Sequence, residues 1–284
     1  MISCLGPRAS FSHICALKIA ELLHLDKTFL YCFDFEEVYN LFKSDKALYA
    51  VLPVENSLGG GIGETLDKVA KASENVEIKL EYVLKIEHNL ISFSKDLSQI
   101  TEIRAHEQAL AQCKDFLKEN FPNAKKIKEV SNSGAVESLV SLEDSERNKI
   151  AAICSKESSE FYNVPIIISK VNDSTDNYTR FWLLGKKENK IDFENSQKLC
   201  SFAFQIPFDE PGGLIRILQP LGENNLNLTR IESRPTRGKL AEYTFFIDTI
   251  KTKPFDFYKL ASKCSYFKFL GEYPVLPEGD FRFC

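Results

Sequence analysis

Short apolar runs alternate with longer segments of helical periodicity through the first 185 residues of the chain. The runs have the length of strands, and several of the segments between them begin at Ser or Asp residues suited to capping a helix. Strands are predicted at residues 2–5, 29–33, 48–54, 76–87, 100–105, 125–130, 149–155, 166–169 and 178–184, and helices at 11–25, 34–42, from 64, 106–120, 131–142 and 155–162. This alternation predicts an α/β fold with a mainly parallel sheet and ligand sites beyond the carboxyl ends of its strands. We expect the loops at those ends to converge, namely residues 6–12, 55–63, 104–108, 131–135 and 172–180.

Residues 76–87 differ from the other strands because their pattern has a period of two. Apolar residues at 76, 78, 80, 82, 84 and 86 alternate with charged residues at most of the positions between them. This predicts a half-exposed strand whose charged face meets solvent.

A second module is predicted at the C-terminal end. Residues 186–197 are polar and charged without an apolar period, which is typical of a linker. Residues 198–284 then give the order strand, helix, strand, strand, helix, strand. This βαββαβ order is that of a small ferredoxin-like domain.

Composition narrows the class of protein. The 284 residues are 44% hydrophobic and 27% charged with a formal net charge of -4, which is typical of a globular protein and gives no electrostatic reason to expect nucleic acid. The N-terminus lacks a basic region followed by a long apolar run, and no segment has the length of apolar sequence that a membrane helix needs, so we expect a cytoplasmic protein without a membrane partner. The eight cysteines are scattered without a CxxC pair, and the four histidines lack ligand spacing, so no metal is expected.

Candidate chemistry begins at residues 172–185, NDSTDNYTRFWLLG. A polar loop here leads into a buried strand and presents Thr179, Arg180 and Phe181 at the strand's entrance. The alternative is a salt-bridged strand end without a functional role.

Two other loops have comparable features. Asn56 and Ser57 precede glycines at 59–61 and 63, which permit close approach of a ligand to the main chain, although a flexible lid explains them equally well. Ser10 or Ser12 can cap the helix that begins at residue 11, and Arg8 beside it favours an anion, although an ordinary capped helix needs no ligand.

The chain resembles prephenate dehydratase with a C-terminal ACT regulatory domain, and the resemblance covers nearly all residues. The matching segments follow in order as GPRASFSH, LPVENSLGG, EHNLIS, AHEQALAQC, AAICS and NDSTDNYTRFWLLG, then PGGLIRIL and IESRP. The resemblance implies a two-lobed, periplasmic-binding-protein-like catalytic domain and a ferredoxin-like ACT domain. The expected boundaries are 1–185 for the catalytic domain (lobes of about 1–80 with 165–185, and 81–164), 186–197 for the linker and 198–284 for the ACT domain.

The activity that the resemblance implies is a carbon–oxygen lyase reaction (EC 4.2.1.51), the conversion of prephenate to phenylpyruvate in phenylalanine biosynthesis, without a cofactor. Thr179 would donate a proton to the departing hydroxyl or organise its hydrogen bonds, Arg180 would bind a carboxylate, and Phe181 would form an apolar wall. The other substrate-binding residues implied are Ser10, Asn56, Ser57, Gln108 and Ser133.

For the ACT domain, the resemblance implies feedback inhibition by L-phenylalanine bound at a subunit interface of a homodimer or homotetramer. The residues implied are Pro211, Gly212, Gly213, Leu214, Glu232, Ser233, Arg234 and Pro235. An ordinary capped helix and a surface ion pair of Arg234 would instead make this domain a dimerisation module. Arogenate dehydratase, which shares the architecture, and a non-catalytic amino-acid-binding regulator are the alternative functions.

Overall fold

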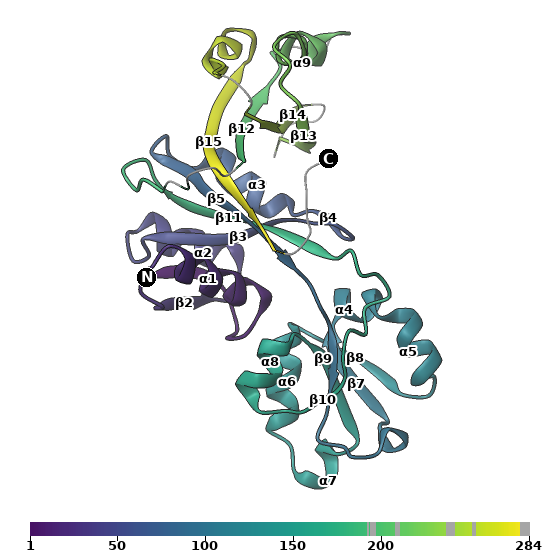
Figure 1. Cartoon of the computed structure of the whole chain (residues 1–284). Coiled ribbons are helices and arrows are strands. Elements are labelled where there is room, and N and C mark those ends of the chain that lie inside the picture. Colours follow the sequence, from purple (N-terminus) through teal and green to yellow (C-terminus); the bar gives the residue numbers. More distant parts are fainter. Residues whose placement is uncertain (192, 194–196, 208–210, 237–241, 252–253, 279–284) are drawn as a thin grey trace. The chain divides into compact units, whose positions relative to one another are not determined.

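The computed structural model describes residues 1–191, 193, 197–207, 211–236, 242–251 and 254–278 (Figure 1). Two compact units are present: the first unit comprises Met1–Ala47, Asn56–Gly60 and Leu84–Thr179, and the second comprises Leu48–Glu55, Gly61–Val83 and Arg180–Cys284. Strand β11 (Tyr178–Lys186) passes from one unit to the other between Thr179 and Arg180. The boundaries expected from the sequence for the catalytic domain, the linker and the ACT domain stay a prediction, and part of the expected linker (192 and 194–196) lies outside the described residues.

The first unit contains two groups of strands with helices. Strands β1 (Ile2–Leu5) and β2 (Phe29–Cys32) pair in parallel and are accompanied by α1 (Phe11–Leu22) and α2 (Phe35–Lys43). A five-stranded sheet has the order β10-β6-β9-β7-β8, in which β7 is parallel to both β8 and β9. Its elements are β6 (Asn89–Ile91), η1 (Leu97–Gln99), β7 (Glu102–His106), α4 (Glu107–Gln112), α5 (Lys114–Asn120), β8 (Lys125–Glu129), α6 (Asn132–Val140), α7 (Asp144–Arg147), β9 (Ile150–Cys154), α8 (Lys156–Tyr162) and β10 (Ile166–Ile168).

Alternating side chains of these strands supply two cores. Ile153 packs with Leu117 of α5, whereas Ala152 and Cys154 pack with Leu139 of α6. Since successive side chains of a strand point to opposite faces, each face of the five-stranded sheet is covered by its own helices. The alternation of strands and helices in the sequence therefore predicted this layered arrangement correctly.

The second unit is built on the strand order β13-β14-β12-β15-β5-β11-β3. Its elements are β3 (Tyr49–Asn56), β4 (Gly60–Gly61), α3 (Gly63–Lys71), β5 (Val76–Lys85), β11, β12 (Lys198–Gln205), α9 (Gly213–Glu223), β13 (Leu228–Pro235), β14 (Tyr243–Ile250), η2 (Phe257–Lys263) and β15 (Tyr266–Pro277). The last six follow the predicted βαββαβ order, with antiparallel pairing of β15 with β12, β12 with β14 and β14 with β13. The second helix of this module is a 3-10 helix.

The last strand, β15, belongs to two pairings. Residues 266–274 pair antiparallel with β12, and Val275 to Pro277 pair in parallel with residues 81–83 of β5. One continuous strand therefore joins the βαββαβ module to the strand that carries Glu81.

The prediction that β5 is half exposed is wrong. Glu81 is 0% exposed and Lys79 is 8% exposed. Glu81 accepts hydrogen bonds from Arg180 and Trp182, and Lys79 donates to Glu77 and to the carbonyl of Lys187. The charged positions of the period-two pattern face polar partners inside the protein, which sequence periodicity cannot distinguish from solvent.

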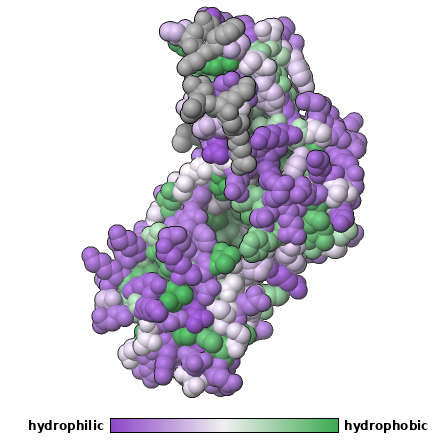
Figure 2. Space-filling model, turned by 180° about the vertical axis from the view of Figure 1, so that it is seen from behind, coloured by the Kyte–Doolittle hydropathy of each residue, from purple (hydrophilic) through white to green (hydrophobic). Residues whose placement is uncertain are grey.

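On the face drawn in Figure 2, hydrophilic residues cover most of the visible surface. Within the described ranges, no helix is both long and apolar enough to cross a membrane. No group of three or more His, Cys, Asp or Glu side chains that could hold a metal ion occurs in the same part of the chain.

Candidate functional site

The loops predicted to converge do so within the first unit. The Ser133 hydroxyl at the start of α6 donates to the carbonyl of Arg8, which joins loop 131–135 to loop 6–12. The backbone N–H of His106 donates to Asn132 Oδ1 at 2.9 Å, which joins strand β7 to the same helix. Each contact joins segments far apart in the sequence, so a single cluster of loops is formed.

The glycine-rich loop is part of this cluster. A Cβ atom at Gly59 would lie 2.4 Å from Gln108 Nε2 and 3.3 Å from Asn56 Oδ1. Gln108 stands in the first turn of α4, as predicted. The absence of a side chain at Gly59 thus allows Gln108 to approach the backbone after Asn56.

Thr179 is held by a network centred on Asn56. The Asn56 amide nitrogen donates to Thr179 Oγ1 at 3.0 Å, to Asn177 Oδ1 at 2.8 Å and to the carbonyl of Tyr178 at 3.2 Å. Its Oδ1 accepts the backbone N–H groups of the next two loop residues, Leu58 and Gly59. Because Thr179 Oγ1 is an acceptor for Asn56, the hydroxyl keeps its own hydrogen for donation to another group.

The network continues through three residues that were not predicted as site residues. Asn177 Nδ2 donates to Gln112 Oε1 at 2.9 Å, and the same oxygen lies 2.9 Å from His88 Nε2. Burial lowers the pKa of His88, although its bond to Gln112 opposes the shift, so the ring is neutral near pH 7. A neutral ring can donate from Nε2, which fixes the orientation of the Gln112 amide. Gln112 lies four residues after Gln108 in α4, a spacing that places both on one helical face and was a usable signal.

Two predicted serines have backbone partners. Ser10 caps α1 by accepting the N–H of His13 at 3.2 Å and donates to the carbonyl of Leu5 at 2.8 Å. Ser57 donates to the carbonyl of Asp176 at 2.9 Å and accepts the N–H of Tyr178 at 3.0 Å. These bonds hold both loops in place, and a direct contact of either hydroxyl with substrate stays a prediction.

Arg180 belongs to the second unit and is surrounded by carboxylates. Its Nε and Nη2 form a bidentate pair with Glu81 at 2.8 and 2.7 Å, Nη1 contacts Glu55 at 2.7 Å, and Nη2 also contacts Asp248 at 2.8 Å. Burial opposes its charge, but Glu81 and Asp248 raise the pKa of Arg180 well above its ordinary value. The guanidinium is therefore paired with protein carboxylates, as in the salt-bridged strand end that the sequence left as the alternative, and its binding of substrate stays a prediction.

Phe181 follows on the opposite side of the strand and is 1% exposed. It packs inside the described structure. Its predicted role as a wall for substrate is not tested by these contacts.

The predicted effector residues lie at two places in the second unit. Gly212, with a φ of 82°, precedes α9, and Gly213 is its first residue. In β13, Ser233 and Pro235 are exposed, whereas Glu232 and Arg234 are partly buried. Arg234 contacts Asp67 of α3 at 3.4 Å, and Cβ atoms at Gly61 and Gly63 would meet Glu232 and Arg234 at 2.4 and 2.0 Å.

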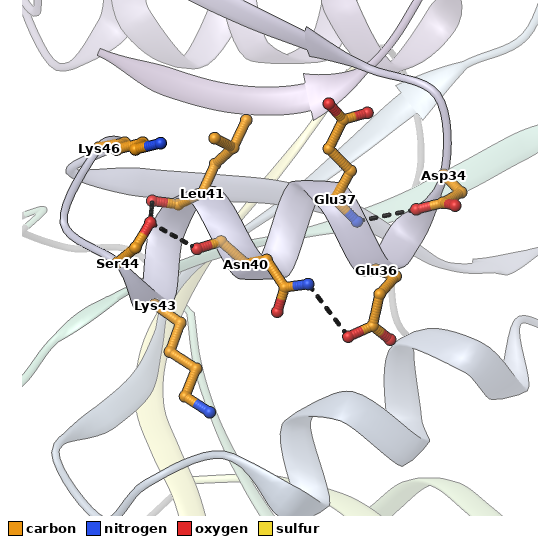
Figure 3. Close-up of a pocket in the computed structure, with 8 residues that line it drawn as sticks. All are labelled: Asp34, Glu36, Glu37, Asn40, Leu41, Lys43, Ser44 and Lys46. Carbon is orange, nitrogen blue, oxygen red and sulfur yellow. Dashed lines mark hydrogen bonds between the residues drawn. The ribbon is translucent and has the colours of Figure 1, made fainter.

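A separate surface hollow of about 700 Å³ lies beside α2 (Figure 3). Its lining side chains bond mainly within their own helix, for example Glu37 N–H to Asp34 and Asn40 to Glu36. The predicted cap of this helix is confirmed, because the Asp34 side chain accepts the N–H of Glu37, and Glu37 accepts the N–H of Phe33, one residue before the cap. None of the predicted site residues lines this hollow, so it is the flank of a helix and not the candidate site.

The fold and the loop cluster define a two-module α/β protein with a buried polar site in one part and a βαββαβ module in the other. The family model for prephenate dehydratase matches residues 2–189, and that for the ACT domain matches residues 204–256. The chain therefore belongs to the prephenate dehydratase family and carries a C-terminal ACT domain. The fold class and the lyase class expected from the sequence are confirmed.

Related proteins match this chain over almost its whole length. The prephenate dehydratase of Methanocaldococcus jannaschii is 34% identical over 273 residues, covering 95% of this chain and 96% of that protein. That of Lactococcus lactis subsp. lactis is 31% identical over 286 residues, covering 98% and 99%. The crystal structure of prephenate dehydratase from Arthrobacter aurescens in complex with L-phenylalanine has a TM-score of 0.83 at 27% identity, covering 96% of this chain and 89% of that chain.

Proposed function

We propose that this protein is a prephenate dehydratase in which Thr179 acts on the departing hydroxyl group. The reaction takes prephenate and a proton to phenylpyruvate, carbon dioxide and water. Breaking the ring carbon–oxygen bond expels a poor leaving group, and a hydrogen-bond donor at that oxygen lowers the barrier. The observation that carries this role is the bond from the Asn56 amide to Thr179 Oγ1, which leaves the hydroxyl hydrogen available for the substrate.

Thr179 is a very weak acid, so its contribution is mainly a preorganised dipole directed at the oxygen where charge develops. A series of hydrogen bonds from Asn56 through Asn177 and Gln112 to His88 preorganises the Thr179 hydroxyl, because each amide side chain is oriented by the next residue in the series. Such a donor needs no reorganisation when the carbon–oxygen bond breaks.

Neutral donors suit the carboxylate that is lost. The ring carboxylate leaves as uncharged carbon dioxide, so a strong cation beside it would stabilise the starting state more than the transition state. We assign Ser10, Asn56, Ser57, Gln108 and Ser133 to the polar lining of the site, and Phe181 to its apolar wall. Occupation of Arg180 by Glu55, Glu81 and Asp248 favours a role in holding β11 rather than in binding that carboxylate.

We further propose that L-phenylalanine is the effector and binds the ACT domain at residues 211–214 and 232–235. The phenylalanine complex of the Arthrobacter relative supports this assignment. A homodimer or homotetramer follows from an ACT site formed between subunits. We place the enzyme in the cytoplasm, where thiols stay reduced, in keeping with the free cysteines in the described residues.

The deciding experiment is phenylpyruvate formation by purified protein given prephenate, without added metal or nucleotide. Parallel assays with arogenate separate the two dehydratases, and a higher kcat/KM for arogenate would replace prephenate as the substrate. Absence of turnover of either compound, with phenylalanine still bound, would favour the non-catalytic regulator.

A further inference from the structure

The second unit contains a buried network of charged side chains that the reaction itself does not require. Asp248 of β14 is fully buried and lies between two arginines. Its Oδ2 is 2.8 Å from Arg180 Nη2 and 2.8 Å from Arg230 Nε, and its Oδ1 is 3.2 Å from Arg230 Nη2. One carboxylate thus binds both cations.

Other groups of the βαββαβ module complete the coordination of Asp248. The Ser201 hydroxyl of β12 lies 2.5 Å from Asp248 Oδ1, and Tyr273 of β15 lies 2.5 Å from Ser201 Oγ. Burial opposes the charge of Asp248, but Arg230 and Arg180 lower its pKa below the ordinary value. The carboxylate is therefore ionised and held from three strands of the ACT domain.

Both arginines lie close in sequence to residues predicted to bind a ligand. Arg180 directly follows Thr179, and Arg230 lies two residues before Glu232, the first of the predicted effector residues in β13. Arg230, Glu232 and Arg234 are the more buried residues of alternating β13, and Arg234 reaches Asp67. A shift of β13 would therefore change how Arg230 contacts Asp248.

Arg230 also retains hydrogen-bonding capacity. Its Nη1 is buried without a hydrogen-bond partner among the described residues and lies 3.8 Å from Glu232 Oε2. Movement of Arg230 toward Glu232 would leave Arg180 as the one arginine bound to Asp248, beside the hydrogen bond from Ser201. Since Arg180 is a covalent neighbour of Thr179, the change would reach the site through one peptide link.

We propose that Asp248 is a positioning residue that couples the ACT domain to Thr179, by sharing its carboxylate between Arg230 and Arg180. The inference rests on the proposed function, because it takes phenylalanine as the effector of this module. Asp248, a side chain of the ACT domain, would thus help to set the geometry at Thr179 even when no effector is bound.

The network contains its own spectroscopic probe. Trp182 is the chain's one tryptophan, its Nε1 donates to Glu81 Oε2 at 2.9 Å, and the Arg230 guanidinium lies 5.0 Å from its ring centre. A change at Arg230 or Glu81 alters the charge beside the indole. Trp182 fluorescence therefore reports the network independently of turnover.

The test uses the full chain and compares Asp248→Asn with Glu272→Gln. Glu272 lies in the same ACT sheet but pairs with Lys251, so its substitution removes a carboxylate outside the network. For each protein, calorimetry measures phenylalanine binding, fluorescence follows Trp182 as phenylalanine is added, and phenylpyruvate formation gives kcat and KM. Circular dichroism verifies folding.

We expect Asp248→Asn to bind phenylalanine within about threefold of the wild-type Kd, a change too small to indicate a lost contact. Its Trp182 response should fall to less than half, its kcat by about tenfold with KM nearly unchanged, and phenylalanine should inhibit it only weakly. Glu272→Gln should match the wild type in every measurement. If Asp248→Asn does not fold, Ser201→Ala, which removes one hydrogen bond to the carboxylate, should show the same changes to a smaller degree.

An unaltered Trp182 response and unaltered inhibition in the folded variant would overturn the proposal, as would a wild-type protein that binds phenylalanine without a fluorescence change or does not bind it. If the wild type makes no phenylpyruvate but Asp248→Asn still abolishes the Trp182 response, the coupling stands and the proposed reaction fails.

Discussion

Substitution of Asn56 is the most direct test of how the Thr179 hydroxyl is oriented. Asn56→Asp keeps an acceptor for the N–H groups of Leu58 and Gly59 but replaces the donating amide with a carboxylate oxygen. That oxygen would face three acceptors, namely Asn177 Oδ1 at 2.8 Å, Thr179 Oγ1 at 3.0 Å and the Tyr178 carbonyl at 3.2 Å. The Thr179 hydroxyl is the one of these that can turn and donate to it.

The expected effect on catalysis follows from this rotation of the Thr179 hydroxyl. A hydroxyl that donates to the introduced carboxylate no longer donates to the departing oxygen. Removal of one preorganised donor at a reacting oxygen lowers kcat by about 10²–10³-fold, or about 3–4 kcal/mol in the barrier. We expect KM to change less than kcat, because the interaction lost belongs mainly to the transition state.

The assay is phenylpyruvate formation over a range of prephenate concentrations, accompanied by urea unfolding. Asn89→Asp is the matched control, because Asn89 is also buried in the first unit, donates to the Cys154 carbonyl and accepts the N–H of Lys170, yet makes no contact with Thr179. Both variants should lose about 2–4 kcal/mol of stability from the buried carboxylate. A folded Asn56→Asp enzyme with kcat within threefold of the wild type would refute the role given to the Asn56–Thr179 bond.

Two other predictions concern the same unit. Thr179→Ala should lower kcat by at least about 10²-fold while Thr179→Ser, which retains the hydroxyl, stays within about tenfold, and equal turnover of the two variants would remove the hydroxyl from the mechanism. Burial, with Arg8 nearby, lowers the pKa of His13 from 6.5 to about 4, and its neutral Nδ1 accepts the N–H of Ala9 at 3.0 Å. Because the unfolded chain binds the proton at a higher pH than the folded protein, stability should be complete above pH 6.5 and decline as the pH falls toward 4, by less than about 3 kcal/mol after allowance for partial exposure. Urea unfolding from pH 7 to pH 4 should show this slope, and His13→Gln should flatten it; an equal slope in that variant would assign the loss to other groups.

The sequence by itself determined the order of elements and the composition of the loops. Apolar runs and capping residues such as Ser10, Asp34 and Ser131 mark local structure, because each cap satisfies backbone groups within three residues of itself. The convergence of the loops was also predicted, although these loops follow strands of two sheets, such as β1 and β7, and not of one sheet. Thr179 and Asn56 were singled out from the composition of their loops and from the family resemblance.

Only the tertiary structure decided the partners of the charged and amide side chains. Glu81 was expected in solvent because a period of two reports which face of a strand is apolar, but it does not report what covers the other face. Gln112, Asn177 and His88 form one chain of hydrogen bonds although 65 positions separate Asn177 from Gln112. Arg180 is an example: the family resemblance implied that it binds a substrate carboxylate, which stays a prediction, and the structure adds contacts with Glu81 and Asp248 that the sequence did not indicate. Such ion pairs depend on which strands become neighbours in the fold, and the local sequence around Arg180 does not predict them.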